Sequence, residues 1–518
     1  MPQLAQTFMW LDWLIVGVYM SVVIVIGVMV SRRGRGAGSD EMILAGRSMP
    51  MWAVAISVLA TSQSAATFIG GPQQAYRGNL TYLLANLGGL LAVIIVAILF
   101  LPAYYRAGVS SVYELIGGKF GTVPQRMASG MFLIGRVFAS GARLFIVALP
   151  VSLIAFGSVE PEALVTSILI VAVAAVTYTM AGGIRAVIWT DVIQAALYVT
   201  TIVLALVLLW QKLPLSITEM FDLLHTADGG SKLKLVDVEF GEDFLARPYT
   251  LPAIIIGLTL FNLAAFGTDQ DLAQRMLTCR NARSAAWSAI LSNIIGWPIV
   301  AMFLLMGVLL WIYFTQNVVD PGYTPDDSRT IFLNFILNDM PMGMRGLMLS
   351  GLFAASMSSL DSALNAMASS SVADFCRSPE QERNAARERI QMRVFTLIWA
   401  AALCGFAIVC VYWQRAGGQT IIDFALGVMV FAYAGLLGVF LTALLTATRG
   451  NAWSVCAGML IGYVCVLLMQ PFVMNEVSIW LGLESPLVIA FPWQMTFATL
   501  IAFIVCCLGK RRSEVTPT

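Results

Sequence analysis

Residues 51–72 read MWAVAISVLATSQSAATFIGGP, an apolar segment with a polar centre. Its length suits a membrane-crossing helix, which needs about 20 mostly apolar residues. The small and hydroxylated residues at 60–67 let such a helix open locally, because Ser and Thr side chains re-satisfy the freed backbone groups. An opened helix exposes carbonyl oxygens that can bind a small cation. The same residues are equally compatible with a helix-packing face rich in Ser and Thr.

The whole chain has the composition of a membrane protein. Of its 518 residues, 59% are hydrophobic and only 11% are charged, whereas about a quarter of the residues in soluble proteins are charged. The net charge of +1 gives no argument for nucleic-acid binding. We therefore predict an all-α membrane protein with thirteen transmembrane helices, at residues 10–31, 51–71, 80–104, 126–155, 161–181, 188–210, 251–270, 284–314, 345–373, 393–414, 420–446, 452–471 and 489–508.

Basic residues collect in alternate loops, which indicates the orientation of the chain. They follow the first, third, seventh and ninth segments and close the chain, at Arg32, Arg33, Arg35, Arg47, Arg106, Lys119, Arg126, Arg275, Arg280, Arg283, Arg377, Arg383, Arg387, Arg389, Lys510, Arg511 and Arg512. Because basic loops stay in the cytoplasm, the N-terminus is predicted outside and the C-terminus inside. The sequence has no Gly-rich phosphate loop for ATP, so any transport is expected to use an ion gradient.

The ninth segment carries a polar stripe. Ser358, Asp361, Ser362 and Asn365 recur at intervals of three and four residues and share one helix face. An unpaired carboxylate in this position would be costly, and a cation beside it would offset that cost. The stripe therefore favours a functional site over simple helix packing.

Three further charged residues lie within predicted helices. Asp191 follows the predicted tight turn at Gly182-Gly183, and it either caps the sixth helix or lies inside it. Arg136 and Arg143 are seven residues apart in the fourth segment and share a face. An arginine there either pairs with an acid or an anionic ligand, or extends to the membrane interface. The sequence leaves these alternatives open.

Several motifs, in the right order from about residue 40 to 450, resemble the sodium:solute symporter family. The run GGIRAVIWTDVIQ at 182–194 is similar to the family signature. Other similar runs are Ala45-Gly46-Arg47, Tyr113-Glu114, Phe120-Gly121 and the segment from Asp269 to Arg275. The resemblance implies a leucine-transporter-type core of two inverted five-helix repeats, each beginning with a broken helix. In the second repeat the break is expected near Asn262, Gly267 and Thr268.

The resemblance also implies how the chain is organised. The first repeat is expected at 51–211, an extracellular loop at 212–250 and the second repeat at 251–446. Residues 1–50 would add one helix and a cytoplasmic loop, and residues 447–518 two helices and a short tail. The implied protein is a sodium-driven carrier in the bilayer of a bacterial inner membrane. It would work as a monomer by alternating access and would not be an enzyme.

Two cation positions are implied by the resemblance. The first joins the broken second helix to the ninth through backbone carbonyls and two hydroxyls, at Ala60, Gln63, Ala355, Ser358 and Ser359. A second falls on Asp191, Ser358, Asp361 and Ser362. Sialic-acid carriers have serine where this chain has Asp361. A second sodium, a proton at Asp361 and a bracing role for Asp361 are therefore all open.

The substrate positions of the sialic-acid members correspond to Ser64, Thr67, Tyr82 and Asn86, and their carboxylate-binding arginine to Arg136 or Arg143. Hydroxyls, an amide and a guanidinium suit a polyhydroxylated acid. The expected solute is a carboxylate-bearing sugar acid such as sialic acid. Alternatives are a neutral sugar, a monocarboxylate or proline. The non-transport alternative is an intramembrane enzyme that uses Asp191 and Asp361 as a carboxylate pair.

Overall fold

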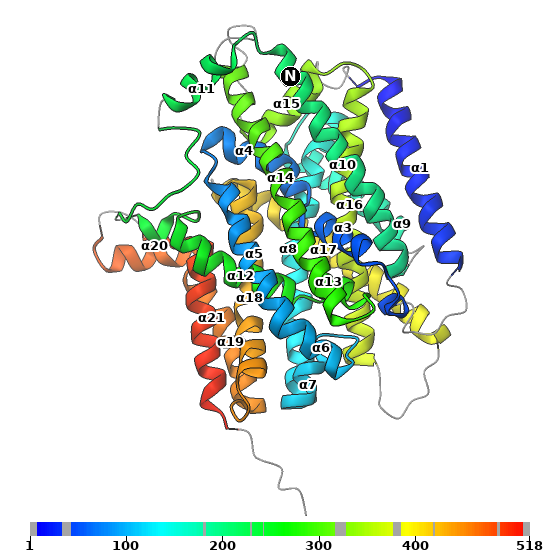
Figure 1. Cartoon of the computed structure of the whole chain (residues 1–518), viewed down its shortest axis with the longest axis vertical. Coiled ribbons are helices and arrows are strands. Elements are labelled where there is room, and N and C mark those ends of the chain that lie inside the picture. Colours follow the sequence, from blue (N-terminus) through cyan, green and yellow to red (C-terminus); the bar gives the residue numbers. More distant parts are fainter. Residues whose placement is uncertain are drawn as a thin grey trace, which may run out of the picture.

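The computed structural model describes residues 8–33, 43–179, 183–227, 230–241, 243–315, 328–376, 385–417, 420–483 and 487–510. Regular secondary structure in these ranges is helical, and the long helices run side by side (Figure 1). Eight units are long and apolar enough to cross a membrane. They are Thr81–Ala107 (which contains α5, Ala85–Ile95, and α6, Leu101–Ala107), α8 (Thr122–Phe156), α10 (Ile184–Lys212), α14 (Ala282–Thr315), Met344–Cys376 (α16, Met344–Ser371, continued by η8, Val372–Cys376), Arg387–Trp413 within α17 (Ala385–Gly417), α18 (Ile421–Leu445) and α21 (Phe491–Leu508).

Three further apolar units are helix pairs bent at a short break. The pairs are α3 (Met51–Ser62) with α4 (Ala65–Arg77) at 59°, Ala253–Gly267 with α13 (Gln270–Leu277) at 58°, and α19 (Ala452–Leu468) with α20 (Pro471–Trp480) at 67°. Two shorter apolar helices are Trp10–Ile26 within α1 (Trp10–Arg33) and Pro161–Thr177 within α9 (Pro161–Thr179). These units coincide one by one with the thirteen predicted segments.

The break between α3 and α4 lies at the polar centre of residues 51–72. Gln63 is extended, with φ −86° and ψ 122°, and ends α3. Ser64 starts α4, because its hydroxyl accepts the N–H of Ala66 at 3.3 Å. The second half, α4, packs closely on α14: a side chain at Gly307 would collide with the carbonyl of Pro72. The predicted opening of this helix is confirmed.

The second break separates α12 (Thr259–Gly267) from α13. Tyr113 donates a hydrogen bond to the carbonyl of Thr268 at 2.9 Å, and Asp269 caps α13 by accepting the N–H of Asp271 at 3.0 Å. The break was predicted correctly, but the predicted end of this segment at residue 270 was wrong. The helix continues through Arg275, which is fully buried and not a loop residue. The carboxylates of Asp191 and Asp271 contact Arg275 and neutralise its buried charge.

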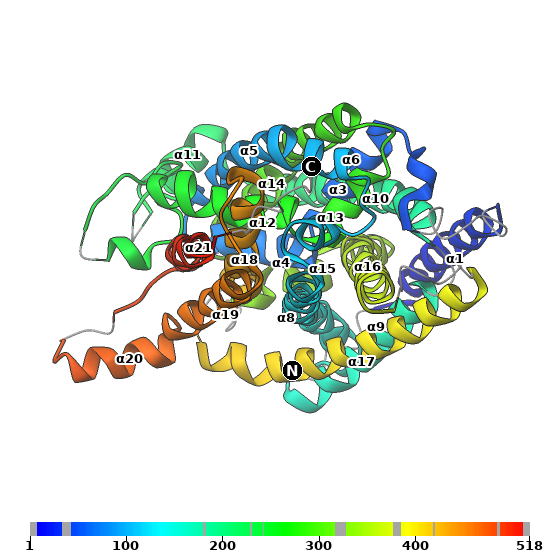
Figure 2. The same ribbon diagram turned by 90° about the horizontal axis from the view of Figure 1, so that it is seen from below.

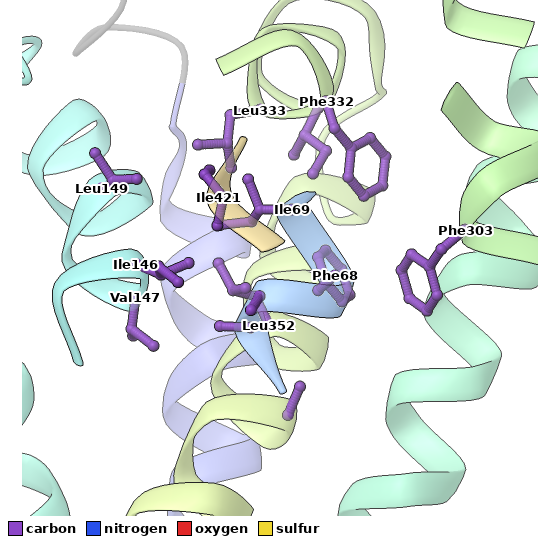
Figure 3. Close-up of a cluster of buried hydrophobic side chains, with 14 of the residues drawn as sticks. Phe68, Ile69, Ile146, Val147, Leu149, Phe303, Phe332, Leu333, Leu352 and Ile421 are labelled. Atoms are coloured by element: carbon purple, nitrogen blue, oxygen red, sulfur yellow. The ribbon is translucent and has the colours of Figure 1, made fainter. Parts of the chain in front are cut away.

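The centre of the bundle is an apolar cluster around α4 (Figure 3). Phe68 of α4 lies 5.3 Å from the ring of Phe303 and 5.5 Å from that of Phe332, which belongs to α15 (Ile331–Asp339). Further members come from the three helices α8, α16 and α18: Ile146, Val147, Leu149, Leu352 and Ile421. This packing holds α4 on the side of the predicted outer face.

Peripheral helices are fixed to this core by polar contacts. Asp12 of α1 accepts the N–H groups of Gly343 and Gly346 at 2.8 and 2.9 Å, so it caps the start of α16. In the predicted extracellular loop, which contains α11 (Ile217–His225), Lys232 donates to the carbonyl of Tyr76 at the end of α4. Burial lowers the pKa of Lys232 to about 8. Seen from below, α1 and α20 lie at opposite edges of the bundle (Figure 2).

Some predicted features lie outside the described residues. They include Gly182 of the tight turn and the basic residues Arg35, Arg377, Arg383, Arg511 and Arg512.

Candidate functional site

A cavity of about 140 Å³ lies beside the break between α3 and α4. Five of the six residues predicted to contact solute line it: Thr67, Tyr82, Asn86, Arg136 and Arg143. Ser64 is not among the lining residues, because its hydroxyl caps α4 instead. The cavity therefore brings together hydroxyl, amide and guanidinium groups from helices far apart in the sequence.

The two arginines of α8 differ in their partners. Arg136 is buried, and its Nη2 lies 2.5 Å from Asp269 Oδ2 and 3.2 Å from Asp271 Oδ2. Tyr433 also donates to Asp269 Oδ2, at 2.6 Å. Within the part of the chain that the structure describes, Arg143 makes no ion pair or hydrogen bond. Arg136 is therefore already neutralised by acids in direct contact, whereas Arg143, which no described acid contacts, presents its guanidinium to the cavity.

The cavity has further polar lining residues that sequence reasoning missed as solute contacts. Asn262 of α12 was noted only as an interruption of its helix, and Asn293 of α14 was not singled out. The Asn262 amide donates to the carbonyl of Leu258 at 2.8 Å, and Trp297 donates to Asn293 Oδ1 at 3.2 Å. An amide inside an otherwise apolar helix was the available signal. With Asn86 and Gln63, they place four amides on the cavity wall.

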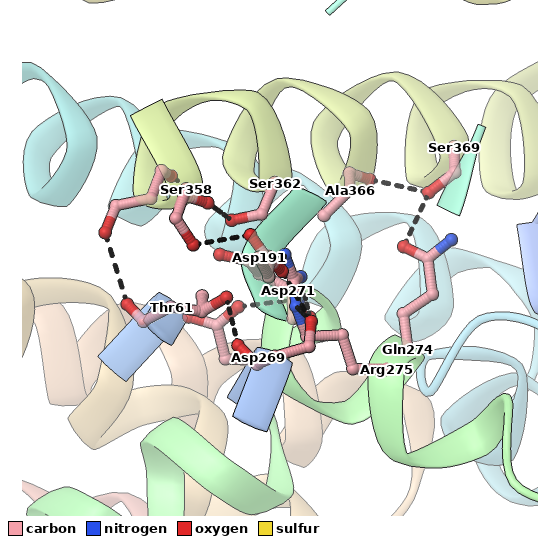
Figure 4. Close-up of polar contacts among 12 residues, drawn as sticks. Thr61, Asp191, Asp269, Asp271, Gln274, Arg275, Ser358, Ser362, Ala366 and Ser369 are labelled. Atoms are coloured by element: carbon pink, nitrogen blue, oxygen red, sulfur yellow. Dashed lines mark hydrogen bonds and ion pairs between the residues drawn. The ribbon is translucent and has the colours of Figure 1, made fainter. Parts of the chain in front are cut away.

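The predicted sodium site lies where α16 passes the end of α3 (Figure 4). The Ser359 hydroxyl is 3.3 Å from the carbonyl of Thr61 and 3.3 Å from that of Ala355. Ala60, Gln63 and Ala355 border one small cavity at this junction. The last carbonyls of a helix have no intrahelical partner, so the end of α3 offers oxygens beside a serine hydroxyl. This oxygen-rich junction suits a hard monovalent cation.

Asp191 lies next to this junction and is fully buried. It accepts hydrogen bonds from the Ser57 hydroxyl at 2.5 Å and the Ser358 hydroxyl at 2.6 Å, and Arg275 Nη2 is 3.2 Å away. Since α10 begins at Ile184, Asp191 lies two turns inside the helix and does not cap it. Of the two alternatives for Asp191, the buried position is correct.

Asp361 has a different environment from Asp191. Its side chain is 1% exposed, and within the described residues neither carboxylate oxygen has a hydrogen-bond partner. The neighbouring Ser362 donates to the carbonyl of Ser358 at 2.7 Å. Among the four residues of the predicted second cation position, Asp191 and Ser358 are in contact and Asp361 has oxygens free for a ligand.

Arg275 was missed by sequence reasoning, which counted it among loop residues. It is 0% exposed and is the largest fully buried side chain in the described ranges. Its Nη1 lies 2.7 Å from Asp271 Oδ1 and its Nε donates to the Ser57 hydroxyl at 2.9 Å. An acid four residues before an arginine on one helix face was the local signal that could have found this pair.

Comparison with known proteins places the chain in a family. It matches the sodium:solute symporter family over residues 42–462. The chain belongs to the sodium:solute symporter family. It is 27% identical over 470 residues to the sodium/sialic acid symporter NanT of Aliivibrio fischeri, covering 89% of this chain and 88% of the relative. It is 26% identical over 452 residues to the sodium/sialic acid symporter SiaT of Proteus mirabilis, covering 87% of each.

A solved structure shares the fold of this family member. A Na⁺-coupled sialic acid symporter in a substrate-bound, outward-open state matches 98% of this chain and 100% of its own, with a TM-score of 0.78 and 22% identity. The leucine-transporter-type fold is confirmed. As a member of this family, the chain is a multi-pass, sodium-coupled symporter and not an enzyme. The bounds of the two repeats stay predictions.

Proposed function

We propose that this symporter carries a carboxylate-bearing sugar acid such as sialic acid into a bacterial cell. The observation that carries the proposal is Arg143, a guanidinium that makes no ion pair within the described residues and lines a cavity that also carries hydroxyl and amide groups. A guanidinium binds a carboxylate through two parallel hydrogen bonds. The sialic acid symporters among the relatives support this choice.

The remaining cavity groups suit the hydroxyl and amide groups of such a solute. Thr67 and Tyr82 offer hydroxyls, and Asn86, Asn262 and Asn293 offer amides. Uptake of a panel containing sialic acid, a neutral sugar, a monocarboxylate and proline separates this proposal from its alternatives. Uptake of the neutral sugar alone would contradict the role of Arg143.

Sodium is proposed to bind at Ala60, Gln63, Ala355, Ser358 and Ser359. There it would order the break between α3 and α4 and favour the outward-open state. Solute would then bind, and the repeats at 51–211 and 251–446 would move to open the inner side. One positive charge moving inward releases about 2.3 kcal/mol per 100 mV of membrane potential. The protein would act as a monomer in the inner membrane, with its N-terminus outside and its C-terminus in the cytoplasm.

Replacing Ser358 and Ser359 together with alanine is expected to abolish sodium-stimulated uptake. Both hydroxyls would be ion ligands, and alanine supplies no oxygen in their place. Initial rates of uptake into proteoliposomes at increasing sodium concentration measure the effect. The matched control is Ser350→Ala with Ser356→Ala, since these serines lie on the same helix and, among the described residues, donate only to carbonyls of their own helix. Equal sodium stimulation in the test variant would disprove this ion site.

Asp361 is proposed to bind a second sodium ion. The reason is its buried carboxylate without a hydrogen-bond donor, which a cation would satisfy. Asp361→Asn is expected to reduce the Hill coefficient for sodium from near two to near one, with the charge carried per solute falling by about one. Asp361→Ser, which installs the residue of the sialic-acid carriers, is expected to keep the coefficient near two. An Asn variant with unaltered sodium cooperativity would rule out this second ion.

A further inference from the structure

A chain of buried charges leads from the solute cavity toward the sodium junction (Figure 4). It starts at Arg136, which lines the cavity and lies 3.2 Å from Asp271 Oδ2. The other oxygen of Asp271 is 2.7 Å from Arg275 Nη1. One carboxylate thus contacts two guanidinium groups, one on α8 and one on its own helix, α13.

The chain continues from Arg275 to the predicted sodium ligand. Arg275 Nη2 lies 3.2 Å from Asp191 Oδ2, and the Ser358 hydroxyl donates to Asp191 Oδ1 at 2.6 Å. Arg275 therefore lies between two carboxylates, with a different nitrogen facing each. Every link from Arg136 to Ser358 is a direct contact.

The burial of this chain makes its members sensitive to one another. The side chains of Arg136, Asp271, Arg275 and Asp191 are all 2% exposed or less. Charges in such an environment are screened weakly. A positive charge added at one end therefore changes how strongly Asp271 and Arg275 each attract the two oppositely charged groups that they contact.

We propose that Arg275 is a positioning residue that couples sodium binding to solute binding. This inference rests on the sodium site proposed above. Sodium at Ser358 would bind the hydroxyl oxygen and leave its hydrogen directed at Asp191, which makes the hydroxyl a stronger donor. Asp191 would then hold Arg275 less tightly, and Arg275 would move toward Asp271.

The movement of Arg275 toward Asp271 is expected to raise the affinity of the cavity for an anion. When Asp271 is held more strongly by Arg275, it neutralises Arg136 less. Arg136 lines the same cavity as Arg143, so the positive potential in the cavity rises. A carboxylate-bearing solute then binds more tightly with sodium than without it. By linkage, the solute raises sodium affinity by the same factor.

The test measures the ratio of solute affinities with and without sodium. Binding of N-acetylneuraminic acid to the purified full chain is measured by calorimetry in sodium and in choline. The wild type is expected to bind about fivefold or more tightly in sodium, a typical size for coupled sites. The charge-balanced variant Arg275→Gln with Asp271→Asn is expected to show a ratio below about two.

A second, milder variant keeps the test valid if the first variant does not fold. Arg275→Lys keeps the charge, but an ammonium cannot reproduce the forked contact with both carboxylates, so an intermediate ratio is expected. Asp374→Asn is the matched control. Asp374 is a buried acid at the C-terminal end of the same membrane segment as Ser358. Within the described residues it accepts hydrogen bonds only from the neutral donors Ser111, Gln125 and Ser129. Its variant is expected to keep the wild-type ratio.

The outcomes separate this inference from the proposed function. A purely structural role for Arg275 would lower thermal stability or both affinities together and leave their ratio unchanged. A wild-type ratio retained in both Arg275 variants would overturn the inference alone. Equal solute affinity in sodium and choline for the wild type would overturn the proposed function and, with it, this inference.

Discussion

Arg143→Ala is expected to weaken binding of the carboxylated solute by about a hundredfold or more. Truncating one partner of a buried, hydrogen-bonded charge pair costs about 2–5 kcal/mol, and about 1.4 kcal/mol corresponds to a tenfold change in affinity. The loss is expected to be near the upper end because Arg143 makes no direct ion pair with an acid within the described residues. Without it, the guanidinium left on the cavity wall would be that of Arg136, which Asp269 and Asp271 already neutralise.

The measurement is the dissociation constant of N-acetylneuraminic acid in saturating sodium. Arg143→Lys is expected to lose less affinity than Arg143→Ala, because lysine keeps the charge but not the forked geometry. Arg126→Ala is the control, since Arg126 lies on the same helix, is exposed and is outside the cavity. An unaltered dissociation constant in Arg143→Ala would disprove an anionic solute held by this residue.

Arg136→Met is expected to lower the stability of the folded protein instead. Removing one partner of a buried ion pair destabilises a protein by about 3–5 kcal/mol, because the other charge is left uncompensated. Here Asp269 would lose its 2.5 Å contact and Asp271 one of its two guanidinium partners. The expected result is a large fall in the unfolding temperature and in the yield of monodisperse protein.

Thermal unfolding of the purified variants measures this effect. Adding Asp269→Asn to Arg136→Met is expected to recover most of the lost stability, because it removes the uncompensated carboxylate. Tyr433 can still donate to the amide oxygen that replaces its carboxylate acceptor. If Arg136→Met were as stable as the wild type and had lost only solute binding, Arg136 would be the solute ligand and the assignment of the two arginines would be reversed.

The features that sequence predicts well are local. A membrane-crossing helix is determined by its own apolar length, so the thirteen segments could be found one at a time. The break at Gln63 could be predicted because its small, hydroxylated residues are contiguous. The polar stripe of Ser358 and Asp361 followed from helical spacing alone, and the structure buries both.

The features that sequence could not settle depend on contacts between distant segments. Arg136 and Arg143 share a helix face, and they are distinguished by Asp269 and Asp271, which contact Arg136 from more than 130 residues further along the chain. Arg275 looks like a cytoplasmic loop residue until Asp191, 84 residues earlier, is brought beside it. Ser64 is a polar residue next to the cavity, but its role as a helix cap depends on where α4 begins.

Uptake of labelled N-acetylneuraminic acid into proteoliposomes tests the central claim most directly. With an inward sodium gradient, the solute is expected to accumulate above its external concentration and to leave again when a sodium ionophore collapses the gradient. With equal sodium on both sides and no membrane potential, uptake is expected only to reach equilibrium. Accumulation that is the same with and without the sodium gradient would contradict sodium-driven transport of this solute.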